Sequence, residues 1–599
     1  MSEVKKLRKR EEIKDKYKWK IDKIYENLDK WDCDLEDLKK EAPKLKDFEG
    51  KLGNKEDLKA FLKLSENLSR KLEKLYVYAH MRSHEDTSNS KMQALVNKID
   101  PFSAEFYSYS AYFVPEILSL KEGTIEKFIE EDEDLKIYKI YFDMILKEKP
   151  HILTKEVEEV LASVSDCLGA PNNIYEMLTN SDMTFGEILD ENLKKVELTE
   201  GNYSSFIKSK DRRVREEAFK LLFKTYKKYE NTLATSLNAS IKNFVFGSKV
   251  RKYNSSLESS LKPNNIPVEV YYNALKTVDK NLSSLHRYVS LKKRLLNLDE
   301  IHMYDLYVPV VDSIKEHLEY EDSIKLVLEG LKPLGEEYLN IFKEGIKDGW
   351  VDVYENKGKR SGAYSWGSYD TMPYVLLNYN YELNDASTLA HEMGHSIHSY
   401  YTRKTQPYIY GDYSLFCAEV ASTTNEILLI HYLIDKETDK NKKLYLINQE
   451  LEQIRTTVFR QLMFAEFELR THEAIEGGES LTAETLCKMW KDINLKYFGE
   501  DMIVDEEICV EWARIPHFYS DFYVYQYATG YAAASSFAKE ILNKGEEAVD
   551  KYKGFLKAGG SMYPIDTLKR AGVDMTTEKP LQDTLNRFNE LLDMLEEIL

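Results

Sequence analysis

Residues 386–401 of this 599-residue chain read ASTLAHEMGHSIHSYY. Apolar residues recur there at three- and four-residue spacing, which predicts a helix, and Asn384 or Asp385 can cap its start. A helix places His391 and His395, four residues apart, on one face and one turn apart. Two such imidazoles can share one metal ion, so the HExxH spacing predicts a zinc site. The competing interpretation is a chance match, which the helical frame makes less attractive.

A catalytic zinc site also needs a general base and a third protein ligand. Glu392 is too close in sequence to bind the same ion beside both histidines, so we expect it beside the attacking water as a general base. A catalytic zinc usually has three protein ligands. The pattern HExxHxxGxxH would supply the third, but its last two positions hold His398 and Tyr401 here. We therefore expect His398 not to be a ligand.

The next predicted helix, SLFCAEVASTTNEILLIHYLI (414–434), offers two carboxylates. Glu419 and Glu426 are seven residues apart, so both lie on one helical face. Two carboxylates on an otherwise apolar helix are costly unless they have partners. One carboxylate as a metal ligand and the other holding an imidazole N–H would explain both. The alternative is a pair of surface carboxylates.

Composition and charge exclude several classes of protein. The chain is 43% hydrophobic and 31% charged, the balance of an ordinary globular protein. Its net charge of -19 argues against binding nucleic acid or an anionic membrane. The five cysteines are scattered without a CxxC pair, as in a reducing cytosol. The first residues lack the apolar core of a secretory signal, and no run is long and apolar enough to span a bilayer, so we predict a cytoplasmic protein.

The chain is predicted to be mainly α. Only 25 glycines and 14 prolines interrupt it, which favours long helices. Amphipathic spacing predicts helices near residues 55–80, 124–147, 211–250, 267–296, 321–346, 440–475 and 578–598. No clear linker divides the chain. The weak boundary near 195–210 suggests an N-terminal helical domain, 1–200, and a catalytic domain, 201–599.

One region departs from the helical pattern. Residues 349–380 are rich in Gly, Tyr, Val and Trp, and they predict short strands at about 350–355, 362–367 and 373–379. A small β-sheet is therefore expected directly before the histidine motif. The last of these strands is a candidate to pair with a bound peptide.

Two long segments carry a resemblance to a known family. PYVLLNYNYELNDASTLAHEMGHSIHSYY (373–401) followed by FCAEVASTTNE (416–426) resembles the oligoendopeptidase F branch of the thimet-oligopeptidase-like zinc metallopeptidases. YKWKIDKIYENLDKWDCDLEDLKK (17–40) is also similar to that branch, so the likeness runs along essentially the whole chain. HExxH alone is only moderately specific. Together with the preceding strand and the glutamate helix, it is highly specific.

The resemblance implies a role for each of five residues. The zinc ligands of the family fall on His391, His395 and Glu419, the last of which lies 24 residues beyond the second histidine. The catalytic glutamate falls on Glu392. The glutamate that supports a ligand from behind falls on Glu426.

The fold and activity of the family become expectations for this chain. The resemblance implies a mainly α, two-lobed body that encloses a deep channel, with a zincin-like core in which the small sheet adjoins the HExxH helix. It implies one Zn²⁺ per chain and hydrolysis of internal peptide bonds in short flexible oligopeptides. Glu392 would take the proton of a zinc-activated water and deliver it to the leaving amine. The alternatives are an exopeptidase, such as a carboxypeptidase, and a non-catalytic peptide-binding protein that contains zinc.

A tyrosine-rich segment, IPHFYSDFYVYQYATGY (515–531), is the last candidate region. If the segment is helical, Tyr519, Tyr523, Tyr527 and Tyr531 form one stripe, with Tyr525 off it; such a stripe is more often packing than chemistry. The family uses a histidine and tyrosines of this region as oxyanion donors, a role that phenol and imidazole groups can fill. The resemblance assigns that role to His517 and Tyr527. The resemblance leaves the second tyrosine ambiguous: Tyr523, one turn from Tyr527, is our choice, and Tyr525 is the alternative.

Overall fold

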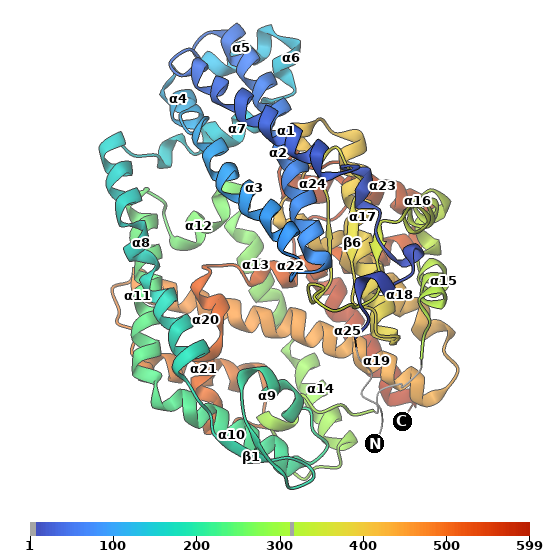
Figure 1. Ribbon diagram of the computed structural model, residues 1–599. Coiled ribbons are helices and arrows are strands. Elements are labelled where there is room, and N and C mark those ends of the chain that lie inside the picture. The colour runs from blue at the N-terminus through green and yellow to red at the C-terminus, as the bar shows by residue number, and fades with distance from the viewer. Residues whose placement is uncertain (1–6, 312–316, 599) are drawn as a thin grey trace. The chain divides into compact units, whose positions relative to one another are not determined.

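A computed structural model describes residues 7–311 and 317–598 (Figure 1). The described chain is mainly helical with three small sheets, which confirms the predicted fold class. It forms two compact units that interleave along the sequence. Within the described residues, the first unit comprises 7–149, 317–435 and 537–573, and the second comprises 150–311, 436–536 and 574–598. The division at residue 200 and the deep channel stay predictions.

Within its described residues, the first unit contains the two helices that carry the predicted metal ligands, α17 and α18, and eleven more. These are α1 (Leu28–Glu41), α2 (Lys55–Glu85), α3 (Ser90–Ser108), α4 (Phe113–Ser119), α5 (Thr124–Glu131), α6 (Glu133–Lys136), α7 (Lys139–Lys147), α15 (Tyr320–Gly330), α16 (Gly335–Asp348), α17 (Leu383–Thr405), α18 (Leu415–Lys436), α23 (Glu546–Leu556) and α24 (Pro564–Arg570). Helices α2 and α3 run side by side (Figure 1). The predicted helix 55–80 is α2, extended to Glu85, whereas the pattern at 124–147 forms the three short helices α5 to α7. The first break comes at Asp132, which adopts an extended conformation and caps α6.

A three-stranded sheet in the first unit adjoins α17. The strands are β4 (Val351–Asp352), β5 (Tyr364–Trp366) and β6 (Tyr374–Leu376), and β6 lies in the middle, parallel to β4 and antiparallel to β5. The three predicted strands are thus present. The expectation that the third strand pairs with a bound peptide is wrong, because both of its edges are already hydrogen-bonded within the sheet. The edge strand β5 is tied to α17 by a 2.8 Å hydrogen bond between the hydroxyls of Ser365 and Ser396.

The hydrophobic core of the first unit joins its N-terminal helices to the sheet. Trp31 is fully buried and donates its indole N–H to the carbonyl of Leu75 on α2 at 3.0 Å. Tyr374 and Leu376 of β6 belong to the same buried cluster. Residues more than 300 positions apart in the sequence therefore share one core, which anchors the strand that precedes the histidine helix.

The second unit contains the remaining helices. These are α8 (Lys155–Met177), α9 (Glu200–Phe206), α10 (Arg212–Lys228), α11 (Glu230–Val250), α12 (Ser256–Leu261), α13 (Val268–Lys280), α14 (Leu282–Leu295), α19 (Lys440–Ile454), α20 (Arg460–Glu476), α21 (Ala483–Phe498) and α25 (Lys579–Ile598). Helix α22 (Tyr525–Lys544) begins in this unit and ends in the other. Two-stranded sheets pair β1 (Glu187–Leu189) with β2 (Lys195–Glu197) and β3 (Ile301–His302) with β7 (Met502–Ile503). No helix in the described parts of either unit is long and apolar enough to cross a bilayer.

Candidate active site

Helix α17 positions both histidines of the motif. Its N-cap is Glu382, two residues earlier than the first predicted cap. Asp385 acts from within the first turn instead, where its Oδ2 accepts the backbone N–H groups of Asn380 and Glu382 at 2.9 Å each. The helical spacing brings the rings of His391 and His395 to a centroid separation of 4.8 Å, with their planes nearly perpendicular. The predicted arrangement on one helical face is therefore present.

Gly394 allows α18 to approach α17 closely. A Cβ atom on Gly394 would lie 2.6 Å from Cα of Ser422 and 3.0 Å from the carbonyl oxygen of Ala421, closer than packed atoms can be. Asn425 of α18 also donates its side-chain amide to the carbonyl of Ala390 at 2.9 Å. The glycine within the motif thus has a packing function, which brings the glutamates of α18 within reach of the histidines.

His391, His395 and Glu419 form a group that can hold a metal ion. One potential ligand atom from each residue lies within 4.8 Å of the other two. Oε2 of Glu419 is 3.4 Å from Nε2 of His391 and 3.5 Å from Nε2 of His395. Hydrogen bonding from His395 lowers the pKa of Glu419 to about 2, so this carboxylate is ionised and available as a ligand. Two imidazoles and one carboxylate are a donor set that suits zinc and leaves a position for water.

Glu426 contacts the ring of His391 on the side that faces away from Glu419. Its Oε2 is 3.2 Å from Nδ1 of His391, while Nε2 of that ring faces Glu419. A carboxylate in this position fixes the orientation and tautomer of a ligating imidazole. The two glutamates of α18 therefore both meet the histidine helix, as the sequence predicts.

Glu392 occupies a different environment from the two α18 glutamates. It is 7% exposed, and burial raises its pKa while the two adjacent imidazoles oppose that shift. A buried carboxylate with a raised pKa is suited to exchanging protons near neutral pH.

Three other histidines have partners outside the metal group. His398 is buried and stacks on Tyr413 with ring centroids 3.7 Å apart. On α2, His84 faces the hydroxyl of Tyr364 at 2.7 Å, and His80 contacts Asp100 at 2.8 Å. Among the described residues, none of these three histidines belongs to a group that could hold a metal ion.

The second unit brings together the three residues suggested as oxyanion donors. The ring centroids of His517, Tyr523 and Tyr527 lie 5.5 to 6.1 Å apart in each pair. His517 belongs to a 3₁₀ turn, Pro516–Tyr519, and α22 begins only at Tyr525. The four tyrosines at four-residue spacing therefore do not form one helical stripe.

Tyr525 and Tyr519 pack elsewhere in the second unit. Tyr525 is 2% exposed, and its ring contacts Tyr271 at a centroid distance of 5.1 Å. Tyr519 stacks on Tyr175 at 4.5 Å. This packing favours Tyr523 over Tyr525 as the neighbour of Tyr527.

The structure adds residues for which the sequence contains no local signal. Phe522, directly before Tyr523, has φ of 57°, a left-handed conformation that is rare for a residue other than glycine. Its N–H is held by Glu468 of α20, 54 positions earlier. Nε2 of His472 lies 2.9 Å from Oδ1 of Asp521. The contacts of this turn join distant parts of the sequence, so residue spacing does not reveal them.

Comparisons with known proteins agree with this geometry. Residues 205–587 match the model of Peptidase family M3, and residues 116–185 match Oligopeptidase F. The chain is 48% identical to Oligopeptidase PepF of Bacillus subtilis, an alignment that covers 100% of this chain and 90% of PepF. It is 40% identical to Group B oligopeptidase PepB of Streptococcus agalactiae, with 98% of both chains covered.

Solved structures show the same likeness. A crystal structure of oligoendopeptidase-F from Enterococcus faecium matches with a TM-score of 0.74 and 37% identity, covering 95% of this chain and 99% of that one. A structure from Chlamydophila abortus matches with a TM-score of 0.95 and 37% identity, covering 99% and 100%. The family match and the whole-length identities show that the chain belongs to peptidase family M3, among the oligoendopeptidase F metalloendopeptidases.

Proposed function

We propose that the chain is a zinc-dependent endopeptidase that hydrolyses internal bonds of short flexible oligopeptides. The observation that carries this proposal is the group of three ligand atoms within 4.8 Å, with the buried carboxyl of Glu392 on the same helix. His391, His395 and Glu419 would hold one Zn²⁺, and Glu426 would orient His391. A structural zinc in a non-catalytic protein is disfavoured, because three protein ligands leave one position open. A cytoplasmic location stays a prediction from the sequence.

Each side chain near the metal group has a chemical task in this proposal. Zinc bound there would polarise the scissile carbonyl and lower the pKa of water. Glu392 takes a proton from the attacking water and later delivers it to the leaving amine. Its burial supports this role, since a raised pKa brings the carboxyl closer to the pH at which both transfers are fast. Glu426 holds the Nδ1 side of His391 and keeps Nε2 directed toward Glu419.

We assign the stabilisation of the oxyanion to His517, Tyr523 and Tyr527. Peptide hydrolysis places negative charge on the carbonyl oxygen, and preorganised N–H or O–H donors lower the energy of that state. Two supports exist: the family resemblance, and the grouping of the three rings within the second unit. A substrate backbone would pair with the edge strand β5, because β6 is already paired on both sides.

The decisive experiment is hydrolysis of a peptide pool that includes peptides blocked at both ends, read by mass spectrometry. Cleavage of internal bonds in blocked peptides, abolished by chelator and restored by Zn²⁺, is the expected result. Removal of single terminal residues from unblocked peptides alone would establish an exopeptidase instead. Binding of peptides without any cleavage would establish the non-catalytic alternative.

Two variants test the residue roles in the same assay. Glu392→Gln is expected to retain metal and to lose turnover by at least about 100-fold, the usual range for a general base. Glu419→Ala is expected to lose metal measured by atomic absorption after dialysis. Retained turnover in the first variant, or unchanged metal content in the second, would contradict the corresponding role.

A further inference from the structure

The first unit contains a cavity of about 320 Å³ beside the first two turns of α17, the helix that carries both histidines. Asp385 and Thr388 of α17 form one wall. Gly362 and Ala363, which directly precede β5, form another, and residues 377–380, which follow β6, form the rest. The cavity therefore lies where β5 and β6 diverge beyond their last paired residues, next to the start of α17.

Asp385 supplies this cavity with a carboxylate oxygen that has no partner. Its Oδ2 accepts the backbone N–H groups of Asn380 and Glu382 at 2.9 Å each, which fixes the position of the carboxylate. Its other oxygen, Oδ1, makes no hydrogen bond or ion pair within the described part of the chain, and it is accessible to solvent. The charges of Glu382 and Asp385 outweigh the partial positive charge at the start of α17. A carboxylate held in this way is a preorganised acceptor for a cationic group.

No basic side chain lines the cavity among the residues that the structure describes. Arg360, two residues before Gly362, contacts Nε2 of His84 on α2 at 2.8 Å, and its guanidinium lies over the ring of Tyr364. Tyr364 faces His84, whereas the next residue, Ser365, bonds to α17, so the two point to opposite faces of the sheet. The guanidinium of Arg360 thus lies on the face turned away from α17 and does not neutralise the cavity.

The cavity lies on the same side of α17 as residues proposed for metal binding and catalysis. Asp385 and Glu392 are seven residues apart and therefore share a helical face, and the same holds for Thr388 and His395. At a rise of about 1.5 Å per residue, about 10 Å separates Asp385 from Glu392 along the helix axis. An extended peptide covers that distance in about three residues.

Strand β5 connects the cavity with the metal group. Ala363, directly before the strand, lines the cavity, while Ser365 bonds to Ser396, the residue that follows the ligand His395. Within the described sheet, β5 pairs only with β6, so its other edge is open. A peptide paired with this edge would therefore extend from the metal group toward the cavity.

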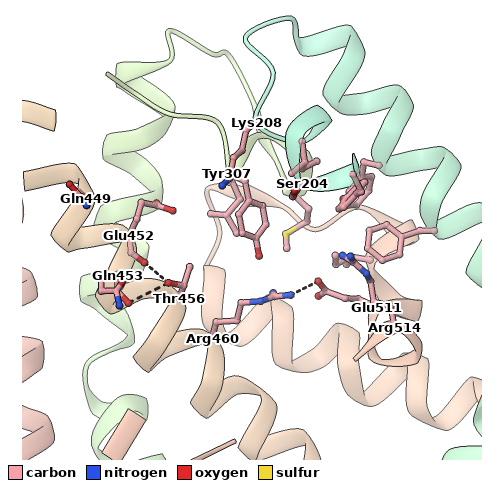
Figure 2. Close-up of a pocket in the computed structure, with 17 residues that line it drawn as sticks. Ser204, Lys208, Tyr307, Gln449, Glu452, Gln453, Thr456, Arg460, Glu511 and Arg514 are labelled. Atoms are coloured by element: carbon pink, nitrogen blue, oxygen red, sulfur yellow. Dashed lines mark hydrogen bonds and ion pairs between the residues drawn. The ribbon is translucent and has the colours of Figure 1, made fainter. Parts of the chain in front are cut away.

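A larger cavity in the second unit, of about 480 Å³, offers no comparable acceptor (Figure 2). In its wall, Glu511 is paired with Arg460 at 2.7 Å (Figure 2). Glu452 is paired with Arg455 at 2.8 Å. A cationic group entering that cavity would meet acids that are already neutralised, whereas the acid beside α17 is unpaired.

We propose that the cavity beside α17 is a subsite that selects a cationic side chain of the substrate, lysine or arginine, about three residues from the cleaved bond. The cation would donate a hydrogen bond to Oδ1 of Asp385 while the substrate backbone pairs with β5. The inference rests on the proposed peptidase function and adds a substrate preference to it. Asp385 acts as a specificity-determining residue and takes no part in breaking the bond.

The test measures kcat/KM by mass spectrometry for pairs of peptides of equal length, blocked at both ends. One member of each pair has lysine at a single position on either side of the cleaved bond, and the other has norleucine, which is uncharged and of similar size. Lysine is expected to raise kcat/KM at least about tenfold at one position, about three residues from the bond, and to have little effect elsewhere. Equal cleavage within every pair would overturn the inference and leave the proposed endopeptidase function intact. Absence of all cleavage would instead refute that function, and the subsite with it.

Variants assign the preference to the cavity. Asp385→Asn keeps an oxygen for the two backbone N–H groups and is expected to reduce the lysine advantage below about threefold, with the norleucine peptide cleaved as by the parent. Thr388→Lys places a cation in the cavity and is expected to abolish the advantage without changing the metal content. Asn384→Lys, at an exposed position in the first turn of α17 outside the cavity, is the matched control and should retain the advantage. An advantage that survives both cavity variants, or that the control also removes, would overturn the assignment.

Discussion

The backbone N–H of Phe522 donates a 2.6 Å hydrogen bond to Oε1 of Glu468, a carboxyl group buried on α20. This bond holds a left-handed turn immediately before Tyr523. Burial raises the pKa of Glu468 well above its ordinary value, which favours the uncharged form of the carboxyl. The hydrogen bond maintains a strained backbone conformation beside Tyr523, and such strain is common at functional sites.

Glu468→Leu is accordingly expected to lower kcat by on the order of 10- to 100-fold, because the ring of Tyr523 would lose its position. The matched control is Glu468→Gln, which keeps a carbonyl acceptor for Phe522 and should retain most of the activity. Steady-state kinetics of both purified variants with a quenched fluorescent peptide provides the measurement. Equal losses in the two variants would show that the carboxyl acts through something other than this hydrogen bond.

Tyr525 and Tyr527, at the start of α22, are expected to differ in function, and removing the hydroxyl of each tests this. Tyr527→Phe is expected to lower kcat with little change in KM, because a donor to the oxyanion acts mainly in the transition state. Tyr525→Phe alters a ring that packs against Tyr271 and should leave kcat within about twofold of the parent. A rise in KM alone for the Tyr527 variant would argue for ground-state binding of substrate.

The close contact between α17 and α18 can be tested at Gly394. Gly394→Ala places a methyl group against the backbone of Ser422, so the helices must separate. Urea denaturation is expected to show a loss of about 1–3 kcal/mol in the free energy of unfolding, typical of overpacking. Metal content after dialysis should fall as well, since Glu419 moves with α18.

Gly247 provides the control for that substitution. It lies within α11, and a Cβ there would meet nothing within 4 Å. Gly247→Ala should therefore be neutral or stabilise the protein by about 0.5–1 kcal/mol, the ordinary effect of alanine in a helix. A loss of stability similar to that of Gly394→Ala would mean that the close contact between α17 and α18 is not the cause.

The buried side chain of His84 is expected to make the folded protein less stable in acid. Burial, aided by the charge of Arg360, lowers its pKa to about 4, below the value of about 6.5 in an unfolded chain. Between these values the unfolded state binds more protons, so the free energy of unfolding falls as the pH falls from about 6.5 to about 4. The full effect is at most about 3 kcal/mol for a shift of this size.

The measurement is urea denaturation of the parent and of His84→Gln at about pH 7 and at about pH 4.5. Most of the expected change in the free energy of unfolding falls between these two pH values. The parent should lose more stability than the variant between the two pH values. Identical pH dependence in the parent and the His84 variant would contradict the prediction.

Local patterns predict the centre of the metal group because helical geometry is local. The four-residue spacing of His391 and His395 sets their relative position once α17 forms, and the seven-residue spacing does the same for Glu419 and Glu426. That these pairs face each other depends on the contact at Gly394, which spacing does not reveal. The strands before α17 were equally predictable one by one, but their order depends on pairing between distant residues, so β6 was wrongly expected to be free.

Other features depend on tertiary contacts to an even greater degree. The amphipathic pattern at 440–475 continues through Arg455–Phe459 without any sign of the π turn there. The tyrosine periodicity at 519–531 suggests one helix, whereas the segment changes direction at Phe522, where Glu468 supplies a hydrogen bond. At Phe522 a buried carboxyl group from another helix holds the backbone. Residue periodicity reports which face is apolar and carries no information about such partners.

The interleaving of the two units has a consequence for biosynthesis. The first unit is completed only by residues 537–573, so its N-terminal helices leave the ribosome long before their last packing partners are made. The second unit is completed even later, by α25, which packs against α19. Neither unit can mature as an independent domain during translation, and both must close near the end of synthesis. For the same reason no single proteolytic cut can release either unit intact.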